Sequence, residues 1–131
     1  MFKYFAVVIS IIFAANCSAA DVADVNYGII CVPTANLRAD AMHETELYDQ
    51  EIMGYPVKLL QKKDNWYQVQ MEYGYVGWMN EKSFVQVNSL QLVHWKNNPK
   101  VRFTKVFGFV YSKPDTASQP VTNVVMNVLL K

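Results

Sequence analysis

The stretch from residue 56 to residue 78 constrains the fold most, because alternating apolar residues and turn residues follow each other closely there. Apolar alternations at 57–60 and 66–71 are followed by Gly-Tyr-Val-Gly-Trp at 74–78. Side chains on a strand point to alternate faces. Both faces of the middle segment carry large residues, with Trp66, Gln68 and Gln70 on one side and Tyr67, Val69 and Met71 on the other. We therefore predict three short antiparallel strands in a curled sheet.

Turn residues separate these predicted strands. Residues 61–65 read Gln-Lys-Lys-Asp-Asn and residues 72–74 read Glu-Tyr-Gly. Charged residues, asparagine and glycine are typical of tight turns, since asparagine and glycine tolerate backbone conformations that other residues avoid. Short strands joined by tight turns predict a small barrel.

These motifs resemble the bacterial SH3 (SH3b) domain over residues 27–87. An Asn-Leu-Arg sequence upstream is similar to the opening signature of that family. The residues that carry the resemblance are Asn36, Leu37, Arg38, Gly54, Trp66, Tyr67, Gly74, Gly77 and Trp78. The resemblance implies an all-β fold. A long polar loop is expected after Arg38, followed by a segment that leads the chain back to Gly54. One helical turn at 80–84 should precede a last strand at 84–87.

The end of the chain repeats part of this pattern. A shift of about 73 positions places Val110 on Leu37, Met126-Asn127 on Met53-Gly54 and Leu130-Lys131 on Val57-Lys58. The polar loop at 113–120 then matches the first polar loop. Internal repeats indicate repeated structural units. We predict that residues 101–131 are the first half of a second SH3b domain, after a linker at 88–100 in which residues 90–95 are extended.

This predicted second unit lacks counterparts of residues 66–78. An incomplete sheet has unpaired edges and exposed apolar side chains. Either the sequence is a piece of a longer protein, which we favour, or the last strands dock against the first barrel.

The first 20 residues predict export. Lys3 precedes an apolar run at 4–15, and small residues follow at 18–20, where a signal peptidase would cleave. The run is shorter than a membrane-spanning helix requires, so we expect no stable membrane anchor. The predicted location is the periplasm or the outside of the cell. A lipoprotein with lipid on Cys17 is the alternative, and Asn16 at the preceding position disfavours it.

Charge and cysteine content exclude several functions. Loss of Lys3 with the leader would leave 11 basic and 11 acidic residues, and such a balance disfavours nucleic acid as a partner. Cys31 would then be the remaining cysteine, in an apolar segment that predicts a buried, inert thiol. A nucleophilic role would require His43 or His94 beside it. Cysteine and histidine have no metal-ligand spacing, and we expect no cofactor.

Tandem SH3b domains behind a signal peptide resemble the amino-terminal part of NlpC-family cell-wall peptidases, including those similar to dipeptidyl-peptidase VI. Those enzymes carry an Asp-Cys-small-Gly motif, which this sequence lacks. The resemblance implies a non-catalytic segment that binds peptidoglycan peptides or gates a downstream catalytic domain. The alternative is a stand-alone exported module that binds another protein.

The resemblance also suggests a ligand site. In the family, the first SH3b domain is thought to help hold the free amino end of a wall peptide. A carboxylate beside an aromatic ring suits an ammonium group. By position, Glu46 at the end of the polar loop and Tyr75 in the Gly-Tyr-Val-Gly-Trp motif are the candidates, and we predict that they lie close together.

Overall fold

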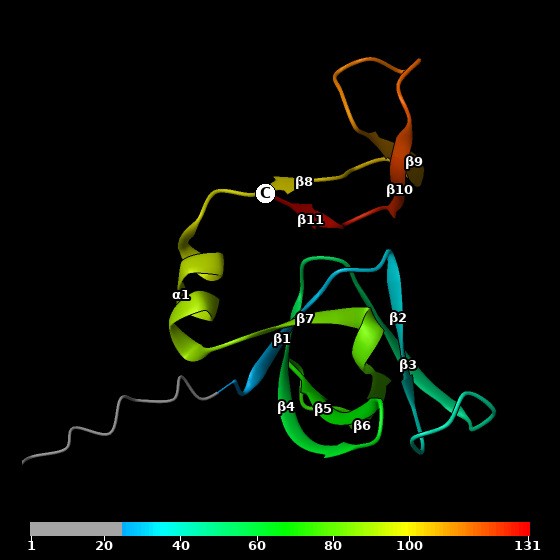
Figure 1. Cartoon of the computed structure of the whole chain (residues 1–131), viewed down its shortest axis with the longest axis vertical. Coiled ribbons are helices and arrows are strands. Elements are labelled where there is room, and N and C mark those ends of the chain that lie inside the picture. Colours follow the sequence, from blue (N-terminus) through cyan, green and yellow to red (C-terminus); the bar gives the residue numbers. More distant parts are fainter. Residues whose placement is uncertain (1–24) are drawn as a thin grey trace, which may run out of the picture.

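The computed structural model describes residues 25–131 and shows two β units joined by a short α-helix (Figure 1). The first unit is a seven-stranded antiparallel sheet in the order β3-β2-β6-β5-β4-β1-β7. Its strands are β1 (Tyr27–Ile30), β2 (Thr34–Arg38), β3 (Leu47–Ile52), β4 (Pro56–Lys63), β5 (Trp66–Met71), β6 (Val76–Asn80) and β7 (Phe84–Val87). The prediction of an all-β, SH3-like fold is confirmed.

The leader predicted at residues 1–20 lies outside the described residues. Within the described part of the chain, no helix is long and apolar enough to cross a membrane. The predicted helical turn before the last strand is present as the 3₁₀ turn η1 (Glu81–Ser83), and the Asn80 side chain caps it by accepting from the Lys82 N–H.

Tight turns connect the three central strands, as their residues predict. Asp64 has a φ of 53° between β4 and β5, and Gly74 has a φ of 100° between β5 and β6. The Gly74 N–H closes its turn by donating to the Met71 carbonyl at 2.9 Å. Positive φ is inexpensive for glycine and is tolerated by aspartate and asparagine. These two turns set the register of the central sheet.

The first unit encloses one apolar core. Strands β1, β2, β4, β5, β6 and β7 all contribute to it, and its buried members are Ile30, Ala35, Leu37, Val57, Leu59, Val69, Met71, Met79 and Phe84. Tyr67 packs against this core, with its ring edge-on to Phe84 at 5.6 Å. Gly77 leaves room for close strand packing, because a Cβ there would lie 2.8 Å from the Arg38 carbonyl oxygen.

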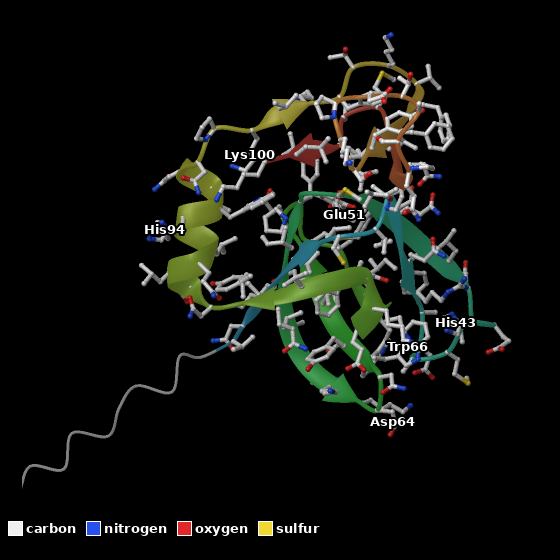
Figure 2. All side chains as sticks on the ribbon, turned by 45° about the horizontal axis from the view of Figure 1, so that its top comes forward. His43, Glu51, Asp64, Trp66, His94 and Lys100 are labelled. Carbon is white, nitrogen blue, oxygen red and sulfur yellow. The ribbon has the colours of Figure 1, made fainter. Side chains whose placement is uncertain are left out.

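Trp66 is buried on another side of the sheet, under the polar loop. Trp66 is 8% exposed, and the His43 ring stands edge-on to its ring at 4.8 Å. Figure 2 shows where the two residues lie on the barrel. Trp78, by contrast, is half-buried, and the Lys63 ammonium lies 6.0 Å from the centre of its ring. Trp66 is therefore a packing residue, whereas Trp78 remains partly accessible.

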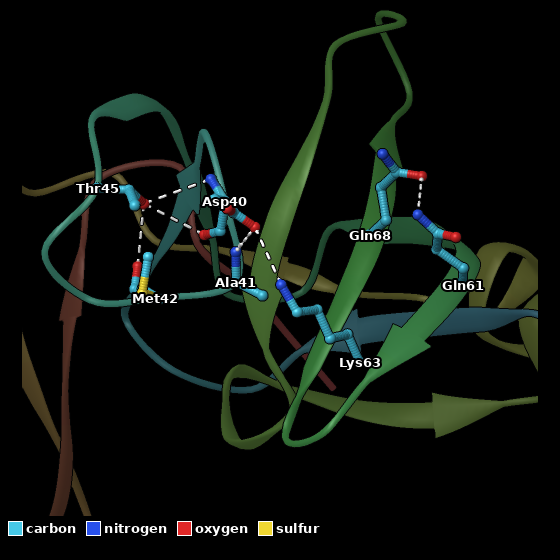
Figure 3. A network of polar contacts seen from close by, with 7 residues as sticks. All are labelled: Asp40, Ala41, Met42, Thr45, Gln61, Lys63 and Gln68. Atoms are coloured by element: carbon cyan, nitrogen blue, oxygen red, sulfur yellow. Dashed lines mark hydrogen bonds and ion pairs between the residues drawn. The ribbon is translucent and has the colours of Figure 1, made fainter.

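The polar loop between β2 and β3 is held by its own side chains (Figure 3). The Thr45 hydroxyl lies 3.2 Å from the Asp40 carbonyl and 3.1 Å from the Met42 carbonyl. The Asp40 carboxylate accepts from the Ala41 N–H at 2.7 Å and lies 3.6 Å from the Lys63 ammonium. The Arg38 guanidinium also donates to the Thr45 carbonyl at 2.7 Å. These contacts give the loop a defined shape.

The extended segment predicted at 90–95 is wrong, because residues 89–97 form the helix α1 (Ser89–Asn97). Asn88 and Gln91 form a reciprocal capping box at its start, with Asn88 Oδ1 accepting from the Gln91 N–H at 2.8 Å. A capping box satisfies backbone donors that a helix leaves unpaired. None of the helical residues is buried. The helix therefore needs no apolar face, and its sequence lacks the apolar periodicity by which most helices are predicted.

The second unit consists of two strand pairs. Strands β8 (Val101–Arg102) and β11 (Leu129–Leu130) pair with each other, and so do β9 (Phe107–Tyr111) and β10 (Pro120–Val125). A shift of 73 residues maps the β1–β4 register onto β8–β11, since Ile29↔Pro56 becomes Arg102↔Leu129. The same shift maps β2–β3 onto β9–β10.

The correspondence extends to the backbone details. The Gly54 N–H donates to the Ile30 carbonyl at 2.9 Å, and the Asn127 N–H donates to the Phe103 carbonyl at 2.8 Å. Both donors have positive φ, 92° at Gly54 and 73° at Asn127. The second unit therefore has the backbone arrangement of the first four strands of the barrel. The assignment of residues 101–131 to a second SH3b domain stays a prediction.

The two units and α1 meet at Gly54. The Trp95 indole N–H donates to the Gly54 carbonyl at 2.9 Å, and the Leu129 N–H donates to the Met53 carbonyl at 3.1 Å. A Cβ at Gly54 would lie 2.4 Å from the Leu129 carbonyl oxygen. Strand β11 thus packs directly against Gly54, where any side chain would collide with Leu129.

Trp66→Ala should lower the free energy of unfolding by about 3–5 kcal/mol, because it removes a large buried ring and leaves a cavity. Trp78→Ala is the matched control and should cost less, since its ring is half-buried. Urea unfolding followed by circular dichroism measures both. Equal losses for the two variants would show that Trp66 does not pack as described.

Gly54→Ala should destabilise the protein more than Gly74→Ala. Both residues have positive φ, which costs a residue with a side chain about 1–2 kcal/mol. Nothing lies within 4 Å of a Cβ at Gly74, whereas Leu129 occupies that space at Gly54. Thermal unfolding of the two variants isolates the contact between the units. Equal losses would mean that Leu129 moves aside without cost.

Candidate functional site: a tyrosine-lined groove

An open groove on the first barrel is lined by Leu37, Tyr48, Tyr75 and Val76 and has a volume of about 330 Å³. We call it the tyrosine groove. Tyr48 and Tyr75 are 56% and 63% exposed, whereas Leu37 at the base is fully buried. Two aromatic rings are therefore available to a ligand over an apolar floor.

A β-bulge places Tyr48 in the groove. Leu37 pairs with Asp49, but the next residue, Arg38, pairs with Leu47, so Tyr48 is an extra residue on β3. A bulge bends the strand and changes the direction of the side chains beside it. Tyr75 reaches the groove from the other side, directly after the Gly74 turn and before β6.

Tyr73 joins the two walls of this region. Its hydroxyl donates to Asp49 Oδ2 at 3.0 Å, and its ring lies edge-on to the Tyr75 ring at 5.6 Å. The Asp49 carboxylate also accepts from the Gln50 N–H at 2.7 Å. These two hydrogen bonds hold the half-buried Asp49 carboxylate in place. Tyr73 connects this carboxylate to Tyr75 of the groove.

Two further acidic residues, Glu51 and Glu72, lie near Asp49. Glu51 on β3 is 8% exposed, lies at the end of the barrel nearest the second unit in Figure 2, and accepts from the Ile52 N–H at 3.1 Å. Burial raises the pKa of Glu51, and the negative charges of Asp49 and Glu72 raise it further. Partial burial and donation to Asp49 raise the pKa of the Tyr73 phenol. The Glu72 carboxylate is paired with the Lys96 ammonium of α1 at 2.7 Å.

The two predicted ligand residues occupy different positions relative to the groove. Tyr75 lines it. Glu46 is exposed and directly precedes β3, and its carbonyl accepts from the Ala39 N–H at 2.9 Å. Glu46 is not among the lining residues, and the carboxylate held beside the tyrosines belongs to Asp49. The close approach of Glu46 to Tyr75 stays a prediction.

The other signature residues build the barrel beneath the groove. Asn36 lies on the outer face of β2, where its Oδ1 accepts from the Gln50 amide at 2.8 Å. The Tyr67 hydroxyl accepts from the Gln86 amide at 3.0 Å. Tyr48, Tyr73 and Asp49 were not predicted as site residues, and the signal that could have found them is the clustering of tyrosines next to acids at 48–49 and 72–75.

The prediction that Cys31 is buried is wrong. Cys31 follows the end of β1 and is exposed. Its thiol lies 3.8 Å from the Lys82 carbonyl oxygen, and partial burial raises its pKa. His43 packs on Trp66 and His94 lies on α1. Within residues 25–131, neither histidine is a hydrogen-bond partner of this thiol, and a raised pKa disfavours the reactive thiolate.

The described residues hold no group of three or more histidines, cysteines, aspartates and glutamates that could bind a metal ion. The tyrosine groove instead combines accessible rings, an apolar floor and nearby negative charge. Such a surface suits a small ligand with an apolar part and a cationic part, since a ring face and a carboxylate both attract a cation.

Comparison with protein-family models identifies the barrel. Residues 37–84 match the model described as the bacterial dipeptidyl-peptidase SH3 domain. This part of the chain is thus similar to a bacterial SH3 domain. The match runs from Leu37 at the floor of the groove to Phe84 in the core, so the tyrosine groove belongs to the SH3b barrel. A search of curated proteins gave no match. An SH3b domain is a non-catalytic module, and no catalytic domain was identified by these comparisons.

Glu51→Gln should raise stability at neutral pH. The folded state raises the pKa of Glu51 above its ordinary value of 4.5, so the ionised form destabilises the fold once the pH exceeds the raised pKa. A neutral amide can accept the same Ile52 N–H without that cost. The melting temperature of Glu51→Gln should exceed that of the unaltered protein at pH 7, and the gain should shrink toward pH 4. Glu44→Gln, which removes an exposed loop carboxylate, is the control for the loss of one acidic group. A gain that is constant from pH 4 to pH 7 would contradict the raised pKa.

Proposed function

We propose that this chain is the recognition part of an exported NlpC-type cell-wall peptidase, and that its SH3b barrel holds the amino end of a peptidoglycan peptide. The observation that carries this proposal is the tyrosine groove with the Asp49 carboxylate next to it, on a barrel that matches the bacterial dipeptidyl-peptidase SH3 domain. The groove would act together with a catalytic domain, either by binding the wall peptide or by covering the entrance to the substrate site.

The chemistry of the groove supports this ligand class. The free amino end of a peptide is an ammonium, which a tyrosine face attracts by about 0.5–1 kcal/mol at an exposed site. A partly exposed carboxylate adds roughly 1 kcal/mol or less. Apolar side chains of the peptide would contact Val76, which lines the groove and is 40% exposed. The isolated barrel should therefore bind only weakly, at about millimolar to high-micromolar concentrations.

The leader-like residues 1–20 support an exported location, the periplasm or the outside of the cell, with lipid attachment at Cys17 as the less favoured route. The near-neutral charge of the remaining chain supports peptides or a catalytic domain, rather than nucleic acid, as the partner.

A second candidate function is a stand-alone module that binds another exported protein. Strand β3 is an edge of the seven-stranded sheet and carries the exposed side chains of Leu47 and Tyr48. An extended segment of a partner could pair with such an edge. This candidate predicts binding through the backbone of β3, with no requirement for a free amino end.

The two candidates differ in an NMR titration with a short peptide that starts with L-Ala, compared with the same peptide after N-acetylation. If the proposal holds, the free peptide shifts the resonances of Tyr48, Asp49 and Tyr75, and the acetylated peptide does so at least about tenfold more weakly, because it lacks the ammonium. Equal shifts with both peptides would exclude the amino-end role and favour the second candidate.

Variants then locate the charge that binds the ammonium. Asp49→Asn and Glu46→Gln each remove one candidate carboxylate, and Glu44→Gln removes an exposed carboxylate of the same loop as a matched control. Tyr75→Leu keeps an apolar side chain and removes the ring. Loss of binding in Tyr75→Leu and in one of the first two variants, with binding retained in Glu44→Gln, is the expected result. Unchanged binding in all of these variants would rule out the groove.

A further inference from the structure

Residues of α1 and of the first barrel line a second pocket, with a volume of about 280 Å³, that the proposed function does not use. We call it the lysine pocket. Its polar lining residues are Tyr27, Lys58, Gln70, Glu72 and Lys96. All of its lining residues fall between positions 27 and 96, so the pocket does not depend on the second unit.

The lysine pocket carries one positive charge that no acidic residue offsets. Lys96 Nζ lies 2.7 Å from Glu72 Oε1, so these two charges compensate each other. Lys58 is exposed, and within residues 25–131 its ammonium forms no ion pair or hydrogen bond. The side-chain amide of Gln70 also has no hydrogen-bond partner in this part of the chain. A cation and an amide donor are thus available to an anion in the same pocket.

A row of paired residues connects the lysine pocket to the tyrosine groove. Lys58 on β4 pairs with Gln70 on β5, and Gln70 pairs with Val76 on β6. Residues that pair across strands point to the same face of a sheet. Lys58 and Gln70 line the lysine pocket, whereas Val76 lines the tyrosine groove. Since neighbouring strands lie about 4.8 Å apart, the backbones at Lys58 and Val76 are separated by about 10 Å.

The turn after β5 leaves the surface between the two sites open. Gly74 lines the lysine pocket, and the next residue, Tyr75, lines the tyrosine groove. Nothing lies within 4 Å of a Cβ built at Gly74. A ligand that extends from one site to the other therefore meets no side chain at this turn residue.

We propose that the lysine pocket binds a carboxylate of the same short peptide whose ammonium binds in the tyrosine groove. This inference rests on the proposed function and adds a second charged contact to it. Lys58 attracts the carboxylate, and the Gln70 amide donates a hydrogen bond to it, which is stronger than a bond between neutral groups. The negative charge of Asp49 beside the groove and the positive charge of Lys58 match the two ends of a peptide and fix its direction.

The spacing of the two sites selects the length of the peptide. An extended chain rises by about 3.3–3.6 Å per residue. Two or three residues therefore cover the roughly 10 Å between the backbones at Val76 and Lys58. The ligand class is a peptide that carries its carboxylate two or three residues from the free amino end.

The test is an NMR titration of the full chain with L-Ala-L-Ala-L-Ala, compared with the same peptide as its C-terminal amide. The amide keeps the ammonium and lacks the carboxylate. We expect it to bind about two- to fivefold more weakly, because an ion pair with an exposed lysine contributes a factor of about five at most. The resonances of Tyr27, Lys58 and Gln70 should shift with the free acid and not with the amide. Equal affinities and equal shifts at these residues would overturn this inference and leave the proposed function intact.

The N-acetylated tripeptide separates this inference from the proposed function. It keeps the carboxylate and lacks the ammonium, so it should still shift Lys58 and Gln70 at high concentration, with the shifts at Tyr48 and Tyr75 lost. Equal binding of the acetylated and the free peptide would remove the proposed function, and the two-point contact with it, whatever the amide shows.

Variants then assign the charge to one lysine. Lys58→Gln removes the ammonium and should bind the free acid and the amide equally, whereas Lys58→Arg keeps the charge and should retain the preference for the acid. Lys82→Gln is the matched control, because Lys82 is an exposed lysine of the first unit outside the pocket. A preference that persists in Lys58→Gln, or that is lost equally in Lys82→Gln, would contradict the assignment. The comparison of acid and amide on the unaltered protein does not depend on the folding of any variant.

Discussion

The left-handed backbone at Gly54 is the position on which the arrangement of both units depends. Its N–H closes the β3–β4 connection by donating to Ile30, and its carbonyl accepts from the Trp95 indole. Leu129 fills the space where a side chain would stand. One residue without a Cβ thus allows the first barrel to turn, α1 to attach and β11 to rest on the barrel. Since these contacts share a single residue, a change there affects all three elements together.

The barrel could be predicted from the sequence because its turns have residue requirements. Gly54 and Gly74 both adopt positive φ, and the alternation between these turns assigns Val69 and Met71 to the core. The partial repeat at 101–131 was visible for the same reason, since Asn127 takes the left-handed position of Gly54. Helix α1 was not predictable from periodicity, because its capping box and its contacts to the barrel, rather than an apolar face, stabilise it.

The groove was predictable only in part. Tyr75 was predicted from the Gly-Tyr-Val-Gly-Trp motif, in which it directly follows the turn residue Gly74. Tyr48 depends on a β-bulge, and a bulge results from the pairing of two strands rather than from a local residue pattern. The bond between Tyr73 and Asp49 joins residues 24 positions apart, which no spacing rule indicates. Cys31 was misplaced because an apolar segment does not reveal where its strand ends.

The repeated backbone does not carry a repeated surface, and the accessible tyrosines beside a carboxylate occur only on the first unit of the described chain. The bulge recurs in β10, where Val121 takes the place of Tyr48 and Thr122 the place of Asp49. Val121 is 67% exposed, but it offers neither a ring nor a charge to an ammonium. The outer face of β9 is instead aromatic, with Phe107 and Phe109 edge-on at 5.1 Å, where β2 carries Thr34 and Asn36. Because the backbones match and the side chains differ, the binding proposed for the tyrosine groove depends on particular residues, Tyr48 on β3 and Tyr75 just before β6, rather than on the SH3-like backbone itself.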